Sequence, residues 1–503
     1  MSAAPVCRPY GEYFPIHEDQ KMTLNLRNPD LLQTRCHIDG TWVGEPSAAV
    51  ENPATLEVVA YVPELGAAET TQAVEAASKA FAGWSRRTAK ERAVILRRWA
   101  ELVTTNRDDL AMIMTSEQGK PLAEALVEID GSAAFIEFYA EEARRIYGET
   151  IPSPRPDARI IVLRQPIGVV AAITPWNFPA SMLARKVSPA LAVGCTCVVK
   201  PAPETPLTAL ALMKLAEEAG MPAGVLNVLT GDAKAIGEVM TSHPAVRVVT
   251  FTGSTPVGKL LMRQASETVK RVGLELGGNA PFIVFDDADV GAAVEGAIIS
   301  KFRNMGQTCV CANRIYVQGG VHDEFVEMLS KKVAAFKVGN GLEQGVIQGP
   351  LINARALEKV EAHVADAIER GARVVTGGAR HHLGGTFFQP TVLADVTAEM
   401  RVSREETFGP LAPVYRFTDE ADVIAQANAT EFGLAAYFYA RDLSRVFRVA
   451  EALEYGMVGI NTGAIANEVA PFGGVKESGI GREGSHHGVE EFTELKYLML
   501  AGL

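Results

Sequence analysis

Two side chains stand out as candidates for covalent chemistry, the thiol of Cys309 and the carboxylate of Glu275. Cys309 follows the polar run Gly306-Gln307-Thr308 after a predicted helix, and Glu275 lies between apolar residues just before Gly277-Gly278. A thiol attacks as its thiolate, in surroundings that favour the anion, and a carboxylate becomes a base near neutral pH when burial raises its pKa. We therefore predict that the two form a nucleophile and base couple. The alternatives are a buried apolar cysteine and a carboxylate that caps backbone amides.

Further polar positions each follow an apolar run that is typical of a buried strand. The Asn177 amide could donate to a developing oxyanion, or could bond only within its own turn. Lys200 could bind a ribose hydroxyl or a phosphate, or could be a solvated lysine. Gly253 and Ser254 precede a predicted helix whose N-terminus would favour a phosphate, although Ser254 or Thr255 could simply cap that helix. Their common position at strand ends favours a shared site.

Short apolar runs alternate with amphipathic segments from residue 168 onward, which predicts a parallel sheet covered by helices on both faces. The predicted strands span 169–173, 196–199, 225–229, 246–251 and 271–276, and the helices between them span 181–193, 206–219, 233–241 and 255–267. This alternation is typical of a doubly wound, nucleotide-binding unit. It starts again at 281–285 and 290–303 and continues to about residue 475, which predicts a second α/β domain.

The remainder of the chain is predicted to be less regular. Helices are expected at 67–81, 89–105, 108–118, 121–129 and 133–147, followed by an extended, hairpin-like segment at 151–162. A Gly-rich loop covers 471–484, and a terminal strand at 489–500 would need a partner edge. Residues 1–21 lack the basic start and apolar stretch of a secretory signal, so a flexible N-terminal arm is expected.

Size and composition restrict the class of protein. A chain of 503 residues exceeds the size at which a single core keeps growing, so two or more domains are expected. The formal net charge of −12 disfavours nucleic acid and anionic membrane as partners, and the apolar runs are too short to span a bilayer. Six scattered cysteines match neither a secreted disulfide framework nor a zinc site. No metal is therefore expected, and a reducing, cytoplasmic location is favoured.

Seven motifs, taken in order, resemble those of the aldehyde dehydrogenase superfamily from about residue 36 to the end of the chain. They are Pro175-Trp176-Asn177-Phe178-Pro179, Lys200-Pro201, Phe251-Thr252-Gly253-Ser254, Leu274-Glu275-Leu276-Gly277-Gly278, Gly306-Gln307-Thr308-Cys309, Glu406-Thr407-Phe408-Gly409-Pro410 and Pro471-Phe472-Gly473-Gly474. Within the superfamily, residues 302–314 and 467–474 are similar to the succinate-semialdehyde dehydrogenase branch. The resemblance implies an α/β fold with a Rossmann-like parallel-sheet cofactor domain, a second α/β catalytic domain and a small β oligomerisation unit.

The same resemblance implies roles for residues along the chain. Cys309 would be the nucleophile, Asn177 with the backbone amide of Cys309 the oxyanion hole, and Glu275 the base. The dinucleotide would contact Trp176, Asn177, Lys200, Pro201, Ala202, Pro203, Gly253, Ser254, Leu276, Glu406 and Phe408. In this chemistry the thiolate adds to an aldehyde, hydride leaves to the nicotinamide, and the base activates a water that hydrolyses the thioester to the acid.

The semialdehyde branch also implies how the substrate is chosen, because two arginines and a serine bind its distal carboxylate. Arg185 and Arg303 match the arginines, Phe178 and Phe472 are expected beside the substrate, and the serine position is Ala466 here. The alternative is that these arginines pair with Asp or Glu on a helix surface. We expect NAD(P)-dependent oxidation of succinate semialdehyde, as in 4-aminobutyrate degradation. Because Ala466 lacks the hydroxyl donor, glutarate semialdehyde or 2-oxoglutarate semialdehyde could also serve.

Cofactor preference and redox control are implied in the same way. NAD-preferring relatives often carry a glutamate at the position of Pro203, where it repels a 2′-phosphate, and Glu204 follows here. NADP is therefore the preferred cofactor, with NAD usable. Cys311 could form a regulatory disulfide with Cys309, or could be a buried thiol.

The implied division of the chain assigns residues 22–148 and 168–278 to the dinucleotide-binding domain and 279–484 to the catalytic domain. Segments 149–167 and 485–503 would pair across subunits in a homodimer or homotetramer. Two rival functions are a cofactor-independent Cys hydrolase and a binding protein that has lost activity. The set of dinucleotide motifs disfavours the first rival, and the presence of all three catalytic side chains disfavours the second.

Overall fold

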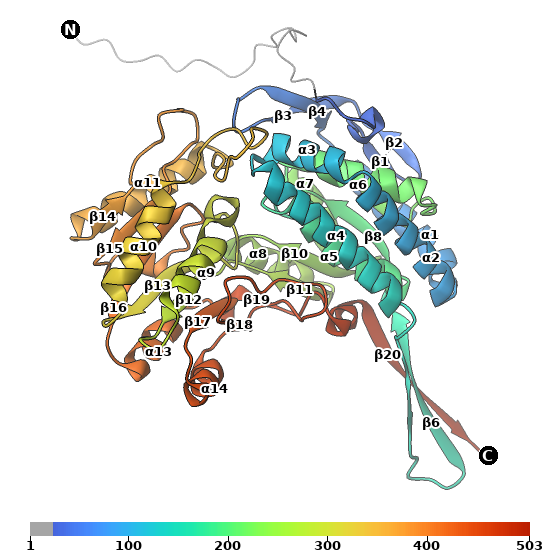
Figure 1. Ribbon diagram of the computed structural model, residues 1–503. Coiled ribbons are helices and arrows are strands. Elements are labelled where there is room, and N and C mark those ends of the chain that lie inside the picture. The colour runs from blue at the N-terminus through green and yellow to red at the C-terminus, as the bar shows by residue number, and fades with distance from the viewer. Residues whose placement is uncertain (1–23) are drawn as a thin grey trace, which may run out of the picture.

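The computed structural model describes residues 24–503, so the predicted N-terminal arm, residues 1–21, lies outside the described part. Helices surround two mixed β-sheets that lie side by side, and a narrow β ribbon projects beyond them (Figure 1). The α/β class predicted from the sequence is confirmed. None of the helices within residues 24–503 is long and apolar enough to cross a membrane.

The first sheet holds strands in the order β19-β11-β10-β7-β8-β9-β1-β2. Its parallel centre consists of β7 (Val169–Ile173), β8 (Thr196–Lys200), β9 (Leu226–Val228), β10 (Val246–Thr252) and β11 (Arg271–Glu275). The antiparallel strands β1 (Cys36–Ile38), β2 (Thr41–Val43) and β19 (Gly479–Ile480) complete its edges. The predicted strands of this region are therefore confirmed, and they form one parallel array.

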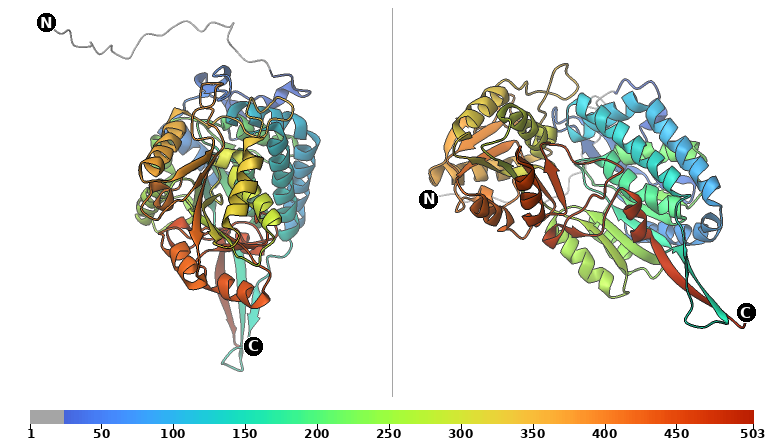
Figure 2. Two further views of the ribbon diagram at one scale, coloured as in Figure 1. Left: turned by 60° about the vertical axis from the view of Figure 1, so that its left-hand side comes forward. Right: turned by 60° about the horizontal axis from the view of Figure 1, so that its bottom comes forward.

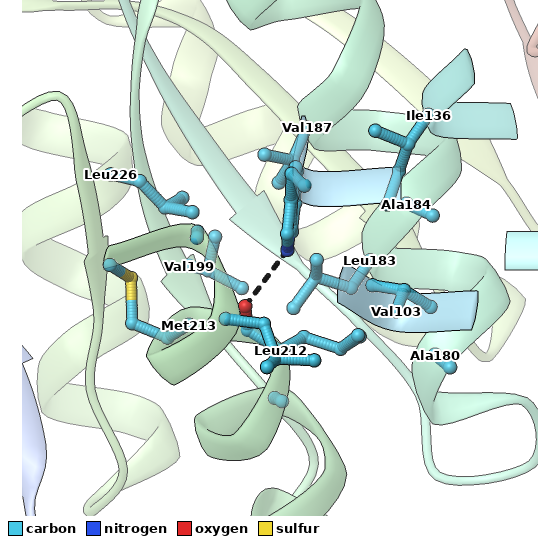
Figure 3. Close-up of a cluster of buried hydrophobic side chains, with 14 of the residues drawn as sticks. Val103, Ile136, Ala180, Leu183, Ala184, Val187, Val199, Leu212, Met213 and Leu226 are labelled. Atoms are coloured by element: carbon cyan, nitrogen blue, oxygen red, sulfur yellow. Dashed lines mark hydrogen bonds between the residues drawn. The ribbon is translucent and has the colours of Figure 1, made fainter. Parts of the chain in front are cut away.

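Helices cover both faces of this sheet, because successive strand side chains point to opposite faces. Val170 of β7 packs in one hydrophobic core, and its neighbour Val169 packs in the other. The first core is covered by α2 (Ala89–Thr105), α3 (Arg107–Gln118), α4 (Leu122–Glu142), α5 (Pro179–Val193) and α6 (Pro206–Glu218), and the second by α1 (Ala67–Ser85) and α7 (Ala233–Ser242). Helix α8 (Thr255–Ser266) packs on β10 and β11. Figure 3 shows Leu183 of α5 and Leu212 of α6 gathered in the first core.

Helix α4 is one continuous helix, which corrects the prediction of two helices at 121–129 and 133–147. The sequence Asp130-Gly131-Ser132 suggested a break, because glycine disfavours a helix interior. In the structure Ile129 and Ile136, two turns apart, are both fully buried on one face. Packing against α2 and α5 therefore carries the helix across the glycine.

The second sheet has the order β14-β15-β16-β13-β12-β17-β18 and is parallel except for β14. Its strands are β12 (Ala280–Val284), β13 (Ala312–Gln318), β14 (Arg373–Thr376), β15 (Thr391–Ala394), β16 (Leu411–Phe417), β17 (Ala435–Tyr439) and β18 (Met457–Ile460). Its helices are α9 (Val290–Phe302), α10 (His322–Ala334), α11 (Ala354–Glu369), α12 (Arg401–Arg404), α13 (Glu420–Asn428) and α14 (Leu443–Ala452). The second α/β unit predicted from residue 281 is confirmed.

A ribbon of three strands, in the order β20-β6-β5, projects away from both sheets (Figure 2). It consists of β5 (Glu149–Ile151), β6 (Ala158–Pro166) and β20 (Thr493–Ala501), so the predicted hairpin-like segment and terminal strand are both confirmed. Strands β3 (Pro46–Glu51) and β4 (Val58–Pro63) form a separate hairpin. Short 3₁₀ helices are η2 (Pro29–Leu31), η3 (Arg303–Gly306), η4 (Lys476–Ser478) and η5 (His486–Phe492).

The chain crosses between the two sheets twice near Glu275. Strand β11 ends at Glu275 and β12 begins the second sheet at Ala280. Strand β19 then returns from the range 279–484 to pair with β11, and a Cβ on Gly479 would lie 2.0 Å from the Leu274 carbonyl oxygen. Only glycine allows this approach, so that range supplies an edge strand to the first sheet as well. The carboxyl ends of β7, β8, β10 and β11 consequently meet the second sheet at one edge, where ligands of doubly wound folds bind.

Candidate active site

A cavity of about 390 Å³ lies at the carboxyl edge of the first sheet, between that sheet and helix α11. Residues predicted from the sequence line it: Trp176, Asn177, Gly253, Ser254, Leu276, Cys309, Glu406 and Phe408. Residues that the sequence did not assign to a site also line it: Pro175, Glu204, Thr252, Gly277, Ile352, Asn353, Arg355, Ala356, Lys359 and Thr407. The thiol of Cys309 therefore shares one cavity with the residues predicted to bind a dinucleotide.

Four residues predicted to contact the dinucleotide do not line this cavity: Lys200, Pro201, Ala202 and Pro203. The Lys200 side chain is buried, its Nζ donates to the Pro201 carbonyl oxygen at 3.0 Å, and burial lowers its pKa. Glu204, the next residue along, does line the cavity. A carboxylate is therefore present here, one position later than in the sequence pattern typical of NAD preference.

The cavity has the groups that a dinucleotide needs. Ser254 precedes α8 and makes no side-chain cap bond, so its hydroxyl and the helix N-terminus are available to a phosphate. The Thr252 hydroxyl is buried without a hydrogen-bond partner among the described residues. The rings of Trp176 and Phe408 meet edge to face at 5.5 Å, which provides an apolar wall. These features fit a nucleotide, and the cations Arg355 and Lys359 add charge complementary to its phosphates.

Glu406 lines the cavity and is hydrogen-bonded to the segment that follows Glu275. Its Oε1 accepts a hydrogen bond from the backbone amide of Gly278 at 3.1 Å. Burial raises the pKa of this carboxyl group to about 7, although the amide and the lysines nearby oppose the shift. The side chain therefore changes charge near neutral pH, beside any ligand of the cavity.

Cys309 is held by a tight turn after α9. Helix α9 ends at Phe302, and Asn304 and Met305 both adopt left-handed backbone conformations, with φ of 50° and 56°. A Cβ on Gly278 would lie 2.4 Å from the Cys309 carbonyl oxygen, so the segment after Glu275 packs directly on the backbone of the thiol. The half-buried thiol faces the cavity from this turn.

The surroundings of Cys309 act in both directions on the ionisation of its thiol. Burial raises the pKa of the Cys309 thiol to about 12, and the Arg185 guanidinium opposes this while Glu275 and Glu406 add to it. Desolvation of the anion outweighs the single positive charge nearby. Formation of the thiolate therefore depends on the Arg185 charge and on any group that a ligand adds beside the thiol.

Glu275 lies at the end of β11 and is almost fully buried. It lines a second, small cavity of about 10 Å³ together with Arg185, Arg482 and Glu483, rather than the cavity of Cys309. Its Oε2 has no hydrogen-bond partner among the described residues. Burial and then repulsion from Glu483 raise its pKa well above the ordinary value, while Lys186, Arg185 and Arg482 oppose the shift. Burial therefore favours the protonated form of this carboxyl group, and the three cations favour the carboxylate that a base requires.

Asn177 follows β7 and is also buried. Its Nδ2 donates one hydrogen bond to the Gln307 carbonyl oxygen at 3.1 Å, two residues before Cys309. An amide nitrogen carries two hydrogens, so one remains for a ligand in the cavity that Asn177 and Cys309 share. The geometry suits a donor to an oxyanion that forms at the thiol.

Comparison with known proteins agrees with this arrangement. The model of the Aldehyde dehydrogenase family matches residues 42–498. The chain belongs to the aldehyde dehydrogenase family. It is 62% identical to a glutarate-semialdehyde dehydrogenase of Pseudomonas aeruginosa, over 483 residues that cover 95% of this chain and 100% of the relative.

Two other relatives are similar over the same length. The chain is 61% identical to the NADP(+) succinate-semialdehyde dehydrogenase of Escherichia coli (strain K12), over 480 residues that cover 95% of this chain and 100% of the relative. It is 60% identical to a 3-sulfolactaldehyde dehydrogenase of Pseudomonas putida, with 95% and 99% covered. Among solved structures, an E. coli NADP-dependent enzyme superposes with a TM-score of 0.94 at 60% identity, covering 95% of this chain and 100% of that chain. The aldehyde dehydrogenase fold expected from the sequence is therefore confirmed.

In this aldehyde dehydrogenase, the two arginines expected at the substrate site each stack on an aromatic ring. The Arg185 guanidinium lies 3.8 Å from the centre of the Phe472 ring, and that of Arg303 lies 4.9 Å from the centre of the Phe178 ring. Arg185 is buried and forms an ion pair with Glu483 at 3.2 Å, yet its Nη2 has no hydrogen-bond partner among the described residues. Both stacked pairs therefore join an arginine to an aromatic residue, Phe472 or Phe178, that the sequence also assigned to the substrate.

Arg303 and Ala466 line one small cavity of about 20 Å³. Thr308 and Val310, the neighbours of Cys309 in the chain, line it as well. No ion pair joins Arg303 to any acidic side chain within residues 24–503, so the alternative of a surface ion pair does not hold for it. The guanidinium lies close enough to Glu124 to oppose the raised pKa of that carboxyl group without forming an ion pair with it, and it also borders this cavity.

Cys311 does not line the cavity of the dinucleotide residues. It is buried, and its Sγ lies 3.2 Å from the Nζ of Lys301, a fully buried lysine that also donates to Asn313 at 3.1 Å. Burial raises the pKa of the Cys311 thiol, and the Lys301 charge opposes the shift. The described cysteines, which include Cys309 and Cys311, are free thiols. Within residues 24–503, no group of His, Cys, Asp and Glu side chains could hold a metal ion.

Proposed function

We propose that this aldehyde dehydrogenase oxidises a semialdehyde that carries an anionic group at its far end, with succinate semialdehyde as the first candidate. The observation that carries the proposal is the unpaired Arg303 in a small cavity beside the turn of Cys309. The three relatives named above act, by their names, on aldehydes that carry a carboxylate or sulfonate. A guanidinium fits both anions, because its donors form a planar fork.

The reaction would begin at the Cys309 thiol, which passes its proton to solvent water and adds as thiolate through sulfur to the aldehyde carbon. The carbonyl oxygen becomes an anion, and the free hydrogen of the Asn177 amide together with the Cys309 backbone amide would hold it. When bound, the oxidised nicotinamide supplies a positive charge and accepts the hydride of that carbon. Glu275 in its carboxylate form would then take a proton from a water that attacks the thioester, and the sulfur leaves as thiolate with the acid released.

NADP is the proposed cofactor, with NAD usable. Ser254, the N-terminus of α8, Arg355 and Lys359 would hold phosphates, and Trp176, Leu276 and Phe408 would hold the apolar parts. The E. coli relatives named above support NADP by their names. Glu204 is the residue that would oppose a 2′-phosphate, because it brings a carboxylate to the same cavity.

Glutarate semialdehyde is the second candidate substrate, because Ala466 takes less space than serine in the cavity of Arg303 and offers no donor to fix a short substrate. Purified protein should be assayed for NADPH and NADH formation with succinate, glutarate and 2-oxoglutarate semialdehydes and with butanal. We expect the carboxylated substrates to give the higher kcat/KM, and Cys309→Ala to abolish reduction of the cofactor. Equal kcat/KM for butanal would contradict the proposal, and ester hydrolysis without any cofactor reduction would favour a hydrolase.

We further propose a homodimer or homotetramer in the cytoplasm, joined through the ribbon of β5, β6 and β20. Leu495 and Tyr497 are 64% and 58% exposed on β20, which pairs with β6 along one edge and forms the outer strand of the ribbon. A free edge strand with apolar residues favours pairing with another chain. The buried free thiols are compatible with a reducing compartment. Light scattering of the full chain and of a Tyr497→Lys variant would test the assembly, which the variant should weaken.

A further inference from the structure

The backbone carbonyl of Asn177 is held by two side chains from different parts of the chain. Lys120, just after α3, donates from Nζ to this oxygen at 2.7 Å, and Asn304, in the turn before Cys309, donates from Nδ2 at 2.9 Å. All three groups are buried. The residue that carries the oxyanion donor is therefore fixed through its main chain from both domains.

The Lys120 ammonium group also contacts a carboxylate and an aromatic ring. Its Nζ forms an ion pair with Glu128 and lies 4.0 Å from the centre of the Phe178 ring. Burial lowers the pKa of Lys120, and the Glu128 carboxylate opposes that shift. Removing water from an ammonium and a carboxylate is costly, so a pair that is entirely buried requires compensation from hydrogen bonds. Here Lys120 reaches the carbonyl before Phe178, and Glu128 reaches the amides after it.

Glu128 completes the support on the other side of Asn177. Its Oε1 accepts hydrogen bonds from the backbone amides of Ala180 at 3.0 Å and Ser181 at 3.2 Å, which are unpaired donors at the start of α5. The Lys120 and Glu128 pair thus binds the chain immediately before and after Phe178. Movement of either side chain would turn the Asn177 peptide relative to the helix that carries Arg185.

Asn304 links the same carbonyl to the turn of the nucleophile. Its backbone is left-handed, with φ of 50° and ψ of 40°, and its Oδ1 accepts from Gln118 Nε2 at 3.0 Å. Its Nδ2 also donates to the Gln307 carbonyl oxygen at 3.2 Å, the same oxygen that accepts from Asn177 Nδ2. The side chain and the main chain of Asn177 are therefore both hydrogen-bonded to the segment that ends at Cys309.

We infer that Lys120 and Asn304 are positioning residues that aim the free amide hydrogen of Asn177 at the oxyanion formed on Cys309. Neither side chain lines the cavity, so both act through Asn177. A donor stabilises an oxyanion only when it points at the place where the charge develops, and a displacement of about 1 Å costs much of the effect. We call the two contacts of Lys120 and Asn304 with the Asn177 carbonyl oxygen the clamp. Loss of the clamp should slow every step that forms an oxyanion and leave other reactions of the thiol unchanged.

The test compares two reactions of the same thiol in full-length protein. Acylation of Cys309 by p-nitrophenyl acetate passes through an oxyanion, whereas alkylation by iodoacetamide does not. For Lys120→Met with Glu128→Gln, which removes both charges of the buried pair, we expect acylation to slow about 10-fold, less than the roughly 100-fold typical for deletion of a donor. Alkylation should stay within about 2-fold of the wild type. Equal slowing of both reactions would overturn the inference.

Two further variants separate positioning from general damage. Asn304→Gly keeps the left-handed backbone and introduces no charge, and it should also slow acylation selectively. Lys270→Met is the matched control, because Lys270 Nζ likewise donates to backbone carbonyls, those of His243 and Val246, away from the cavity. It should leave both reactions unchanged. Comparable selective slowing in Lys270→Met would contradict the assignment.

The decisive measurement is a double-mutant cycle with Asn177→Ala. If the clamp acts through the Asn177 amide, adding the Lys120 change to Asn177→Ala should slow acylation less than about 2-fold further. Additive losses would refute the inference. The inference rests on the proposed chemistry of Cys309, but the ester probe needs neither a semialdehyde nor a cofactor. A wild type that is acylated yet oxidises no semialdehyde would refute the proposed function and leave the clamp to be judged by the cycle.

Discussion

Replacement of Arg303 by methionine is the most direct test of how the substrate is chosen. The change removes the guanidinium and keeps an unbranched apolar side chain, and Glu124 keeps the Lys120 charge and the Asn304 amide that also oppose its raised pKa. A hydrogen bond to a charged group contributes about 1.5–3 kcal/mol, and each 1.36 kcal/mol is a factor of ten. The kcat/KM for succinate semialdehyde should therefore fall about 10- to 150-fold.

Butanal provides the reference, because it has the same number of carbons as succinate semialdehyde and no carboxylate. Both substrates lose the contact of Arg303 with the Phe178 ring, about 0.5–1 kcal/mol for a partly exposed pair. Their ratio of kcat/KM isolates the carboxylate contribution. Ala466→Ser is the complementary change, since it adds a hydroxyl donor to the same cavity and should raise kcat/KM for succinate semialdehyde about 2- to 10-fold.

The result that would refute the carboxylate site is an equal loss for both substrates with Arg303→Met. An equal loss would mean that the arginine supports the turn of Cys309 rather than the substrate. Arg185→Met is expected to behave in that second way, because Arg185 pairs with Glu483 and opposes the raised pKa of Cys309. It should slow both substrates, which makes it the appropriate comparison.

Three other predictions concern the base, the cofactor and the second thiol. Glu483→Gln removes the charge that repels Glu275, so the pKa of Glu275 should fall. The rate of thioester hydrolysis, measured as a function of pH, should then begin to rise at a lower pH than in the wild type. An unchanged pH profile would argue against Glu275 as the base. Glu204→Gln should raise the NADP/NAD ratio of kcat/KM about 5-fold, as expected for about 1 kcal/mol between charges near 4 Å in water, and an unchanged ratio would remove Glu204 from cofactor choice. Cys311→Ala should make peroxide inactivation less reversible by thiol reductant if a Cys309–Cys311 disulfide protects the enzyme, and equal reversibility would exclude that disulfide.

The sequence was sufficient for those features that depend on local pattern. The strand and helix alternation after residue 168 predicted the first sheet, because buried parallel strands are short apolar runs. The positions of Asn177, Gly253 and Glu275 directly after such runs placed them at one edge, since parallel strands end at the same edge. Two predicted helices merged into α4 because burial against α2 and α5 outweighed the propensity of one glycine.

Side-chain direction could not be predicted, because it depends on partners far along the chain. Lys200 lies at the end of its strand as expected, but its ammonium group donates to the Pro201 carbonyl oxygen. Glu204, and not Lys200, lines the cavity. Lys359 lines the cavity from α11, 84 residues after β11 ends at Glu275, and no local pattern marks it. The pair of Lys120 and Glu128 is likewise invisible in the sequence, since its meaning lies in the carbonyl and amides that it binds.

Glu483 connects the nucleophile and the base electrostatically. It pairs with Lys186 and Arg185, the two cations that respectively oppose the raised pKa of Glu275 and that of Cys309. With Glu483 ionised, both cations are shared with it, so they offset less of the effect of burial, which raises the pKa of the thiol and that of the base. Glu483→Gln would release both cations, and the same change that lowers the pKa of Glu275 should lower that of Cys309. Iodoacetamide alkylation of Cys309 against pH should therefore shift to lower pH together with thioester hydrolysis, and a shift of only one of the two profiles would show that the groups ionise independently.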